Sequence, residues 1–497
     1  MIRMNSTATA QRSISSRDLL TGMIVLASLC STYYREDIPS AVTGSGRFAV
    51  YGTDIVGILA LGGVATALLL RPNRRSRPLL QYLVVLGAFL AYCAVVSGVR
   101  ILGGGSDLSS LLIPRANLMA VWVLLLILVL DIRRRVLLLA VSAFSTVLSV
   151  LAFSMSMTWA TYTFSYWQSN AIRTDVLALL FPLHALAAVT FHRSRWRWLI
   201  RLSLGLHLFV LTYCAIISGA RLNALLVPLV VLASLVIFAR GASIRVVLPY
   251  VLVPVLALPL LFVAQGCSEV VKYGVTRSPG FSAILDNGRQ PGHDDCFLNS
   301  PSETRAASTS AAVPHDAGSP AAHEATNPTM PAPTPTPTPA PTAIAPDPTA
   351  LDPTSSKQES TQVRKTVWTE AINDIRSGPY FGPGFRQYQV YYSTTDAHPV
   401  VLGPHNFVLE LALAYGIIGL LMWLSVMTAP LLQAWRRGPR DSATSALTVT
   451  ALGFAFTTAL FEPLMVNPTI LVFCFFAIGV FVARDTPTIP LAEVPNR

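Results

Sequence analysis

The sequence predicts an all-α polytopic membrane protein with about twelve transmembrane helices. Of its 497 residues, 53% are hydrophobic and only 12% are charged, whereas soluble domains carry about 25% charged residues. So few charged residues cannot cover a water-exposed chain of this length, which excludes a soluble globular protein. The net charge of +11 does not indicate nucleic-acid binding, because the basic residues lie between apolar segments rather than on one face.

Apolar runs of about 17–22 residues, long enough to cross roughly 30 Å of hydrocarbon, recur along the chain. The predicted spans are 18–34, 51–70, 79–99, 111–130, 136–156, 174–191, 199–217, 222–239, 246–264, 405–428, 443–463 and 468–484. Every second connecting loop is rich in arginine, and Lys and Arg are enriched in cytoplasmic loops. This bias and the even span count predict cytoplasmic termini and an uncleaved first span.

The chain divides into three parts. Residues 1–264 hold predicted transmembrane helices 1–9, residues 265–404 form a large periplasmic loop, and residues 405–497 hold helices 10–12 and a cytoplasmic C-terminus. Within the loop, about 300–360 is a Pro/Thr-rich insert in which alternating prolines prevent a helix, so it is predicted to be disordered. A short amphipathic helix is predicted over 361–376, because apolar residues recur there every four positions.

Two cysteines lie in the loop, Cys267 and Cys296, and the other four lie in apolar spans. The outer side of the membrane is oxidising, so these two residues are candidates for a disulfide, although the sequence does not decide whether they are bridged. Their spacing from histidines does not resemble a zinc site. We therefore predict no metal and no cofactor.

One candidate catalytic residue stands at the start of the tenth span. In Gly403–Leu421, Pro404 fits a helix start and Asn406 could cap it, so His405 lies at the outer helix N-terminus. The positive helix end and nearby arginines lower an imidazole pKa, and a neutral imidazole is a competent general base. The alternative is an interfacial cap without a catalytic role.

Several arginines fall on the same outer side, against the cytoplasmic bias. Arginine binds phosphate oxygens through a charged planar fork, so a cluster could hold a lipid pyrophosphate without a metal. For any single arginine, the alternative is snorkelling to lipid headgroups. The candidates are Arg221, Arg364, Arg173, Arg386 and Arg115.

The tenth span carries a motif that resembles a known pattern. His405 and Asn406, followed after nine residues by Gly416 and Gly419, resemble the His-[Asn/Ser/Gln]-x9-Gly-x-x-Gly pattern of the O-antigen ligase superfamily. The tight link with Arg221 resembles the family's Ser-Arg-Gly turn, although two residues separate Ser218 from the arginine here.

The outer loop resembles the same family. Its helix carries the Arg-x-x-x-Trp pattern of Arg364 and Trp368, and a Pro-x-x-Gly-x-Gly turn follows. Twelve spans with a long outer loop before the final helices also resemble its topology. The resemblance covers about residues 170–425.

The resemblance implies a periplasmic glycan transferase in the bacterial inner membrane. Such an enzyme moves a glycan from undecaprenyl pyrophosphate to an acceptor hydroxyl, without nucleotide or metal. His405 would deprotonate the acceptor, and Arg221 and Arg364 would bind the leaving pyrophosphate, which is electrostatic catalysis. Direct displacement would invert the anomeric configuration.

Further residues receive secondary roles. Arg173, Arg386 and Arg115 are additional phosphate-binding candidates, and Glu462 could pair with a site arginine or orient His405.

Aromatic, glycine and histidine positions complete the set. Trp368 and Tyr388 could stack on a sugar, with helix packing as the alternative for Trp368. Gly416 and Gly419 would allow close helix approach. His184 and His207, inside apolar spans, are expected to hydrogen-bond with one another or with backbone.

The acceptor stays open. Lipid A–core is favoured, and the alternatives are a growing lipid-linked glycan, as in a polymerase, or a Ser or Thr hydroxyl of a protein. A secondary transporter is disfavoured, because the two halves differ and the polar candidates lie at the outer boundary rather than at the midplane. A structural wall-associated protein is a further alternative.

Overall fold

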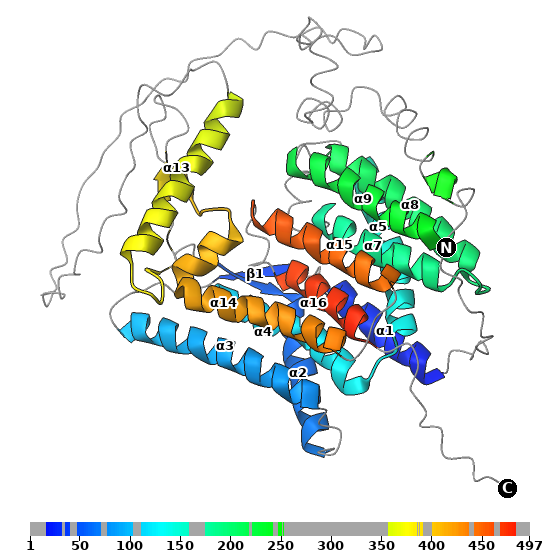
Figure 1. Cartoon of the computed structure of the whole chain (residues 1–497), viewed down its shortest axis with the longest axis horizontal. Helices are drawn as coiled ribbons and strands as arrows, with labels where there is room; N and C mark the ends of the chain where they lie inside the picture. Colours follow the sequence, from blue (N-terminus) through cyan, green and yellow to red (C-terminus); the bar gives the residue numbers. More distant parts are fainter. Residues whose placement is uncertain are drawn as a thin grey trace, which may run out of the picture.

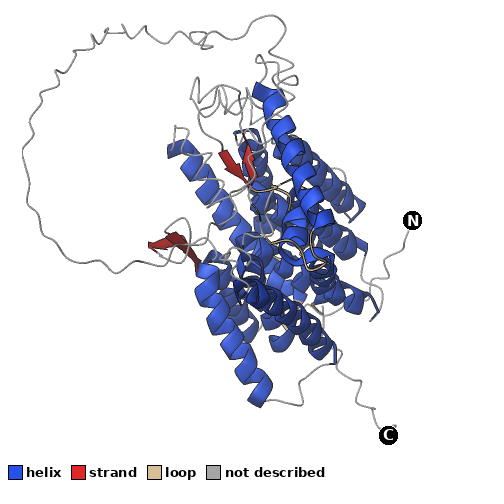
Figure 2. Cartoon of the chain, turned by 90° about the vertical axis from the view of Figure 1, so that its left-hand side faces the viewer, coloured by secondary structure: helices blue, strands red, loops and turns tan. Residues whose placement is uncertain are grey.

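The computed structural model is a bundle of helices (Figures 1 and 2). It describes residues 16–31, 35–39, 47–70, 77–102, 111–158, 174–217, 221–241, 247–250, 252, 356–384, 386, 388–390, 400–436, 442–461 and 468–483. The Pro/Thr-rich insert up to residue 355 and both loop cysteines lie outside these residues.

All described helices except α13 coincide with apolar runs of the sequence. Those before the long loop are α1 (Ser16–Ser31), α2 (Gly52–Leu70), α3 (Arg77–Leu102), α4 (Leu112–Leu130), α5 (Arg134–Thr158), α7 (Thr174–Thr190), α8 (Arg197–Ile217) and α9 (Arg221–Gly241). Those after it are α13 (Ser356–Ser377), α14 (Phe407–Arg436), α15 (Ser442–Ala459) and α16 (Pro468–Val482). Among the predicted spans, only 246–264 falls mostly outside the described residues.

Five described helices are long and apolar enough to cross a membrane. Their apolar segments are Leu79–Leu102, Ile113–Leu130, Arg134–Ser154, Arg197–Ala215 and Phe407–Arg436. Shorter apolar helices form most of the remaining bundle, including α1, α2, α7, α9 and α16. The chain is therefore an integral membrane protein, and the count of twelve spans and their orientation stay predictions.

The predicted all-α architecture is confirmed for the bundle, and two short β-hairpins are added to it. β1 (Arg35–Pro39) pairs antiparallel with β2 (Arg47–Tyr51), which runs directly into α2. β3 (Tyr388–Val390) pairs antiparallel with β4 (Val400–Leu402), so Tyr388 lies opposite Leu402. Strands of three to five residues are too short to give a clear alternation of apolar and polar residues. The second hairpin matters for function, because β4 ends three residues before His405.

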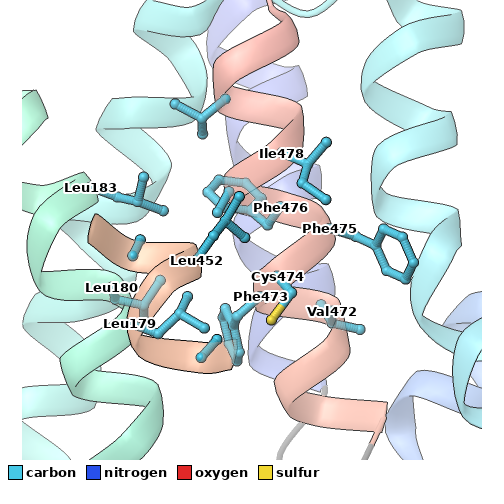
Figure 3. Packing of buried hydrophobic residues seen from close by; sticks show 14 of the residues in the cluster. Leu179, Leu180, Leu183, Leu452, Val472, Phe473, Cys474, Phe475, Phe476 and Ile478 are labelled. Carbon is cyan, nitrogen blue, oxygen red and sulfur yellow. The ribbon is translucent and has the colours of Figure 1, made fainter. Parts of the chain in front are cut away.

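The centre of the core is α16, which is buried along its whole length. A helix that is apolar all round must be covered on every side. In Figure 3, Phe473 of α16 lies near Leu179 of α7, and Phe476 lies near Leu452 of α15. The Phe473 ring also packs against Phe144 of α5, with 5.4 Å between the ring centroids.

The C-terminal end of α16 is held by a buried arginine. Arg134, 2% exposed, donates from Nε to the carbonyl oxygen of Val480 at 3.2 Å and from Nη2 to that of Ala483 at 3.0 Å. A cation at a helix C-terminus satisfies unpaired carbonyls and stabilises the negative end of the helix dipole. This arginine therefore joins α5 to α16.

The interhelical histidine contact expected from the sequence is confirmed. His184 of α7 and His207 of α8 are fully buried, and their Nδ1 atoms lie 3.1 Å apart. His207 Nε2 donates to the carbonyl oxygen of Leu177 at 3.0 Å. Since that nitrogen carries a proton, a neutral His207 accepts at Nδ1 and His184 donates to it.

Candidate functional site

The predicted amphipathic helix is present and packs on the first half of α14. Val363, Val367 and Ala371 of α13 are buried, and they form one cluster with Tyr388 of β3 and Leu413 of α14. Figure 1 shows α13 at one end of the bundle, inclined to the long helices. The helix begins five residues earlier than predicted, at Ser356. Its apolar stripe fixes which side of α13 faces the start of α14.

This packing brings His405 and Arg364 into electrostatic contact. His405 is half-buried in the turn between β4 and α14, and Arg364 lies exposed on α13. Burial lowers the pKa of His405 below its usual value, and the positive charge of Arg364 lowers it further. The imidazole is therefore neutral at neutral pH and can accept a proton. We refer to this pair as the His405–Arg364 site.

The backbone at His405 has an uncommon conformation. Its φ is +48°, in the left-handed region that few non-glycine residues adopt, although histidine is enriched among them. Such a conformation costs of order 1–3 kcal/mol and persists only where neighbouring contacts hold it.

Contacts on both sides of His405 provide this restraint. The Trp368 indole N–H donates to the carbonyl oxygen of Pro404 at 2.6 Å, and its ring lies 6.2 Å from that of Phe461. Asn406 Oδ1 accepts the backbone N–H of Leu409 at 3.1 Å, so Asn406 caps α14 as the sequence predicts. The backbone carbonyl of Asn406 also accepts the N–H of Glu410 at 2.9 Å, so hydrogen bonds hold the residues on both sides of His405.

A break in α14 lies ten residues after the cap Asn406, at Gly416. Gly416 has φ +68° and ψ −175°, which is not helical. A Cβ at this position would lie 2.0 Å from the Tyr380 carbonyl oxygen, and one at Gly382, where φ is +86°, would lie 2.4 Å from the Leu413 carbonyl oxygen. Only glycine fits either position, because the atoms in the way are backbone. The turn after α13 therefore lies directly against the break.

Gly419 has a different neighbour. A Cβ there would lie 2.3 Å from Tyr415 Cβ and 3.4 Å from Tyr92 Cε1 on α3. The first glycine of the motif thus accommodates a turn, and the second accommodates the Tyr415 side chain of its own helix while it contacts Tyr92 of α3.

Two of the predicted outer arginines have carboxylate partners. Arg115 of α4 forms an ion pair with Asp54 of α2, and Arg386 contacts Asp374 of α13 at 3.0 Å. The Tyr388 hydroxyl donates to the same Asp374 at 3.0 Å, and its ring is buried in the α13 cluster. Burial, and then the charge of Asp374, raise the pKa of Tyr388, which keeps this hydroxyl a donor.

The structure does not describe the side chains of the remaining predicted residues. Arg221 is the first residue of α9, and its side chain lies outside the described part of the structure. Arg173, Glu462, Cys267 and Cys296 also lie outside the described residues. Among the residues that are described, no group of three or more His, Cys, Asp or Glu side chains could hold a metal ion.

Sequence reasoning missed two features close to the site. Glu410, 3% exposed, lies in the first turn of α14, and a Cβ on Gly403 would be 3.6 Å from its Oε1. Arg100, at the end of α3, contacts the break in α14. The argument that selected Arg115, a basic residue at the outer end of a span, applied equally to Arg100.

Comparison with known families agrees with this geometry. Residues 206–424 match the family model described as O-antigen ligase. The match begins in α8 and ends within α14, so it spans Arg221, Arg364, His405 and Gly416. The chain therefore carries an O-antigen ligase domain, which indicates a glycan-transferring enzyme of this type. A search of curated proteins returned no match.

Proposed function

We propose that the protein transfers a glycan from undecaprenyl pyrophosphate to an acceptor hydroxyl, most favourably that of lipid A–core. The observation that carries the proposal is the position of His405 before the N-terminus of α14, inside the O-antigen ligase domain, where burial and then the charge of Arg364 lower its pKa. A base next to a fixed positive charge suits a reaction that removes a proton and releases a diphosphate.

The reaction is a single displacement. His405 takes the proton of the acceptor hydroxyl while the oxygen attacks the anomeric carbon of the donor sugar. The bond from that carbon to the pyrophosphate oxygen breaks, and undecaprenyl pyrophosphate leaves with the electron pair. The new glycosidic bond has inverted configuration, and the proton ends on the imidazole.

Arg364 and Arg221 stabilise the charge that builds on the pyrophosphate. Arg364 is exposed on α13 and donates to the Phe461 carbonyl oxygen at 3.4 Å. A guanidinium held before the reaction stabilises the leaving group without reorganisation. Arg221 is the second proposed ligand, because it begins α9 within the matched domain.

The other candidates rank lower. Arg386 and Arg115 each already face a carboxylate, so we propose structural roles for them. Arg173 and Glu462 stay candidates for phosphate binding and for orienting His405. Trp368 positions the turn at Pro404 and could still offer one ring face to a sugar.

The proposed orientation follows from the basic loops of the sequence. Both termini are cytoplasmic, and the His405–Arg364 site lies at the periplasmic surface of a bacterial inner membrane. At the periplasmic surface, the His405–Arg364 site meets undecaprenyl-pyrophosphate glycan that has already crossed the bilayer. A polymerase that extends lipid-linked glycan and a protein O-oligosaccharyltransferase use the same chemistry with other acceptors.

An acceptor panel tests the proposal. Purified protein would be incubated with undecaprenyl-pyrophosphate glycan and, in separate reactions, lipid A–core, a second lipid-linked glycan or a Ser/Thr peptide. EDTA is present and nucleotide is omitted. His405→Ala is compared with His192→Ala, which removes an exposed histidine in the turn between α7 and α8.

We expect transfer to lipid A–core by wild type and His192→Ala, and none by His405→Ala. If product forms only on another acceptor, the proposed transfer reaction stands, and that acceptor replaces lipid A–core in the proposal. Intact donor with all three acceptors would overturn glycan transfer.

A further inference from the structure

The break in α14 lies within the helical hydrogen bonds of three carbonyl groups. In an α-helix, the carbonyl of residue i accepts the N–H of residue i+4, and that bond needs helical backbone at the residues between. The non-helical Gly416 lies between acceptor and donor in the bonds of Leu413, Ala414 and Tyr415, so the backbone there departs from helical geometry. Weakened hydrogen bonds at buried carbonyls are costly, and donors from outside the helix offset that cost.

All three carbonyls accept donors from outside α14. The Gly384 N–H donates to Leu413 at 3.0 Å. Arg100 Nη1 donates to Ala414, and the Tyr92 hydroxyl donates to Tyr415 at 2.9 Å. Each carbonyl beside the break therefore has a donor from outside α14, which stabilises the non-helical backbone at Gly416.

Arg100 joins the break to the turn after α13. Its Nη2 donates to the carbonyl oxygens of Phe381 at 2.9 Å and Gly382 at 2.6 Å, and its guanidinium lies 5.9 Å from the Phe381 ring centroid. One planar fork thus binds three carbonyls from two segments. A lysine has one charged nitrogen and cannot reproduce that arrangement.

Both side-chain donors come from α3, which packs against α14 (Figure 1). Tyr92 and Arg100 are eight residues apart, about two helical turns, and Ser97 between them lies 3.2 Å from the Tyr415 hydroxyl. Gly419 admits the Tyr92 ring close to α14.

We propose that α3, through Arg100 and Tyr92, holds α14 in its broken form and thereby sets the position of His405. The segment Phe407–Tyr415 connects His405 to the break. His405 lies two residues before its start, and Gly416 follows its last residue. Its Leu413 also packs on α13, which carries Arg364. Arg100 and Tyr92 lie outside the matched domain, so α3 completes the site from outside residues 206–424.

This proposal rests on the proposed function, since positioning matters only if His405 acts in transfer. Without Arg100, the carbonyls of Ala414, Phe381 and Gly382 lose their shared donor, and the segment behind His405 is released. His405 then loses burial, which is the larger cause of its low pKa. Its pKa rises toward the usual value, so more of it is protonated in weak acid.

The test compares Arg100→Gln, Arg100→Lys and Tyr92→Phe with two matched controls. Arg376→Gln removes an exposed arginine at the end of α13. Tyr82→Phe removes a hydroxyl from α3 that has no hydrogen-bond partner among the described residues. Transfer is followed as kcat and KM against pH, and backbone hydrogen exchange is measured over residues 404–415.

We expect Arg100→Gln to lower kcat about 100-fold, the effect of a misplacement near 1 Å. The acid limb of its kcat–pH profile should move to higher pH, and backbone hydrogen exchange over residues 404–415 should become faster. Arg100→Lys should be intermediate, and Tyr92→Phe should lower kcat about tenfold. Both controls should match wild type.

The proposal would be overturned if folded Arg100→Gln had the same kcat, the same pH profile and the same hydrogen exchange as wild type. If that variant does not fold, Tyr92→Phe decides, and behaviour equal to Tyr82→Phe would overturn it. Transfer by His405→Ala would instead defeat the proposed function. The exchange measurement does not depend on activity, so the two failures can be told apart.

Discussion

Replacing Gly416 by alanine tests whether the break in α14 is needed. Its backbone, at φ +68° and ψ −175°, lies in a region that is essentially restricted to glycine, and occupying it costs a non-glycine residue about 1–3 kcal/mol. The new Cβ would lie 2.0 Å from the Tyr380 carbonyl oxygen and 2.9 Å from the Gly382 nitrogen. These are backbone atoms, so no rotamer change relieves the overlap.

The turn after α13 must therefore move away from α14. This movement also removes the hydrogen bond from the Gly384 N–H to the Leu413 carbonyl oxygen, worth about 0.5–1.5 kcal/mol. The two contributions together amount to about 1.5–4.5 kcal/mol. Their midpoint of about 3 kcal/mol, at about 1.4 kcal/mol per decade, lowers the population of the native arrangement about 100-fold. We expect transfer by Gly416→Ala to fall by about that factor.

Gly453→Ala is the matched control. Gly453 is exposed on α15, and a Cβ there meets no described atom within 4 Å. Alanine should stabilise that helix by about 0.5–1 kcal/mol. Both variants would be purified in the same detergent, and transfer and thermal unfolding measured on equal amounts of folded protein. Wild-type transfer and melting by Gly416→Ala would refute the reasoning.

Three further predictions concern the turn and the base. Asn406→Ala removes the cap of α14 and should lower stability by about 1 kcal/mol, measured by thermal unfolding, with an unchanged melting curve as the contrary result. Trp368→Phe keeps a ring beside Phe461 but loses the bond to Pro404, so transfer should fall about tenfold; a wild-type rate would show that the bond does not position the turn. Arg364→Gln removes the positive charge that lowers the pKa of His405, so the acid limb of the kcat profile should move to higher pH; no movement, or movement to lower pH, would contradict that coupling.

The helices could be predicted from the sequence because each follows from local composition. Apolar runs of membrane-spanning length gave the described helices near their observed bounds, and the four-residue spacing of Val363, Val367 and Ala371 gave the buried side of α13. His405 was found because its motif and its place before a helix lie within a few residues of one another.

The break and its donors could not be predicted, because they depend on contacts distant in sequence. The Gly-x-x-Gly spacing does not say that a turn approaches Gly416 while a helix approaches Gly419. Arg100 and Arg115 are alike at the level of sequence, but one binds carbonyls of α14 and the other pairs with Asp54. The β3–β4 hairpin is too short to have a pattern of its own.

The central claim is that His405 is the base of the transfer reaction. Its most direct test is the single-turnover rate at saturating donor for wild type and His405→Ala, with donor affinity measured separately. We expect unchanged donor affinity and transfer slowed about 10²–10⁴-fold, the usual contribution of a general base. A His405→Ala enzyme that binds donor normally and transfers at the wild-type rate would contradict it.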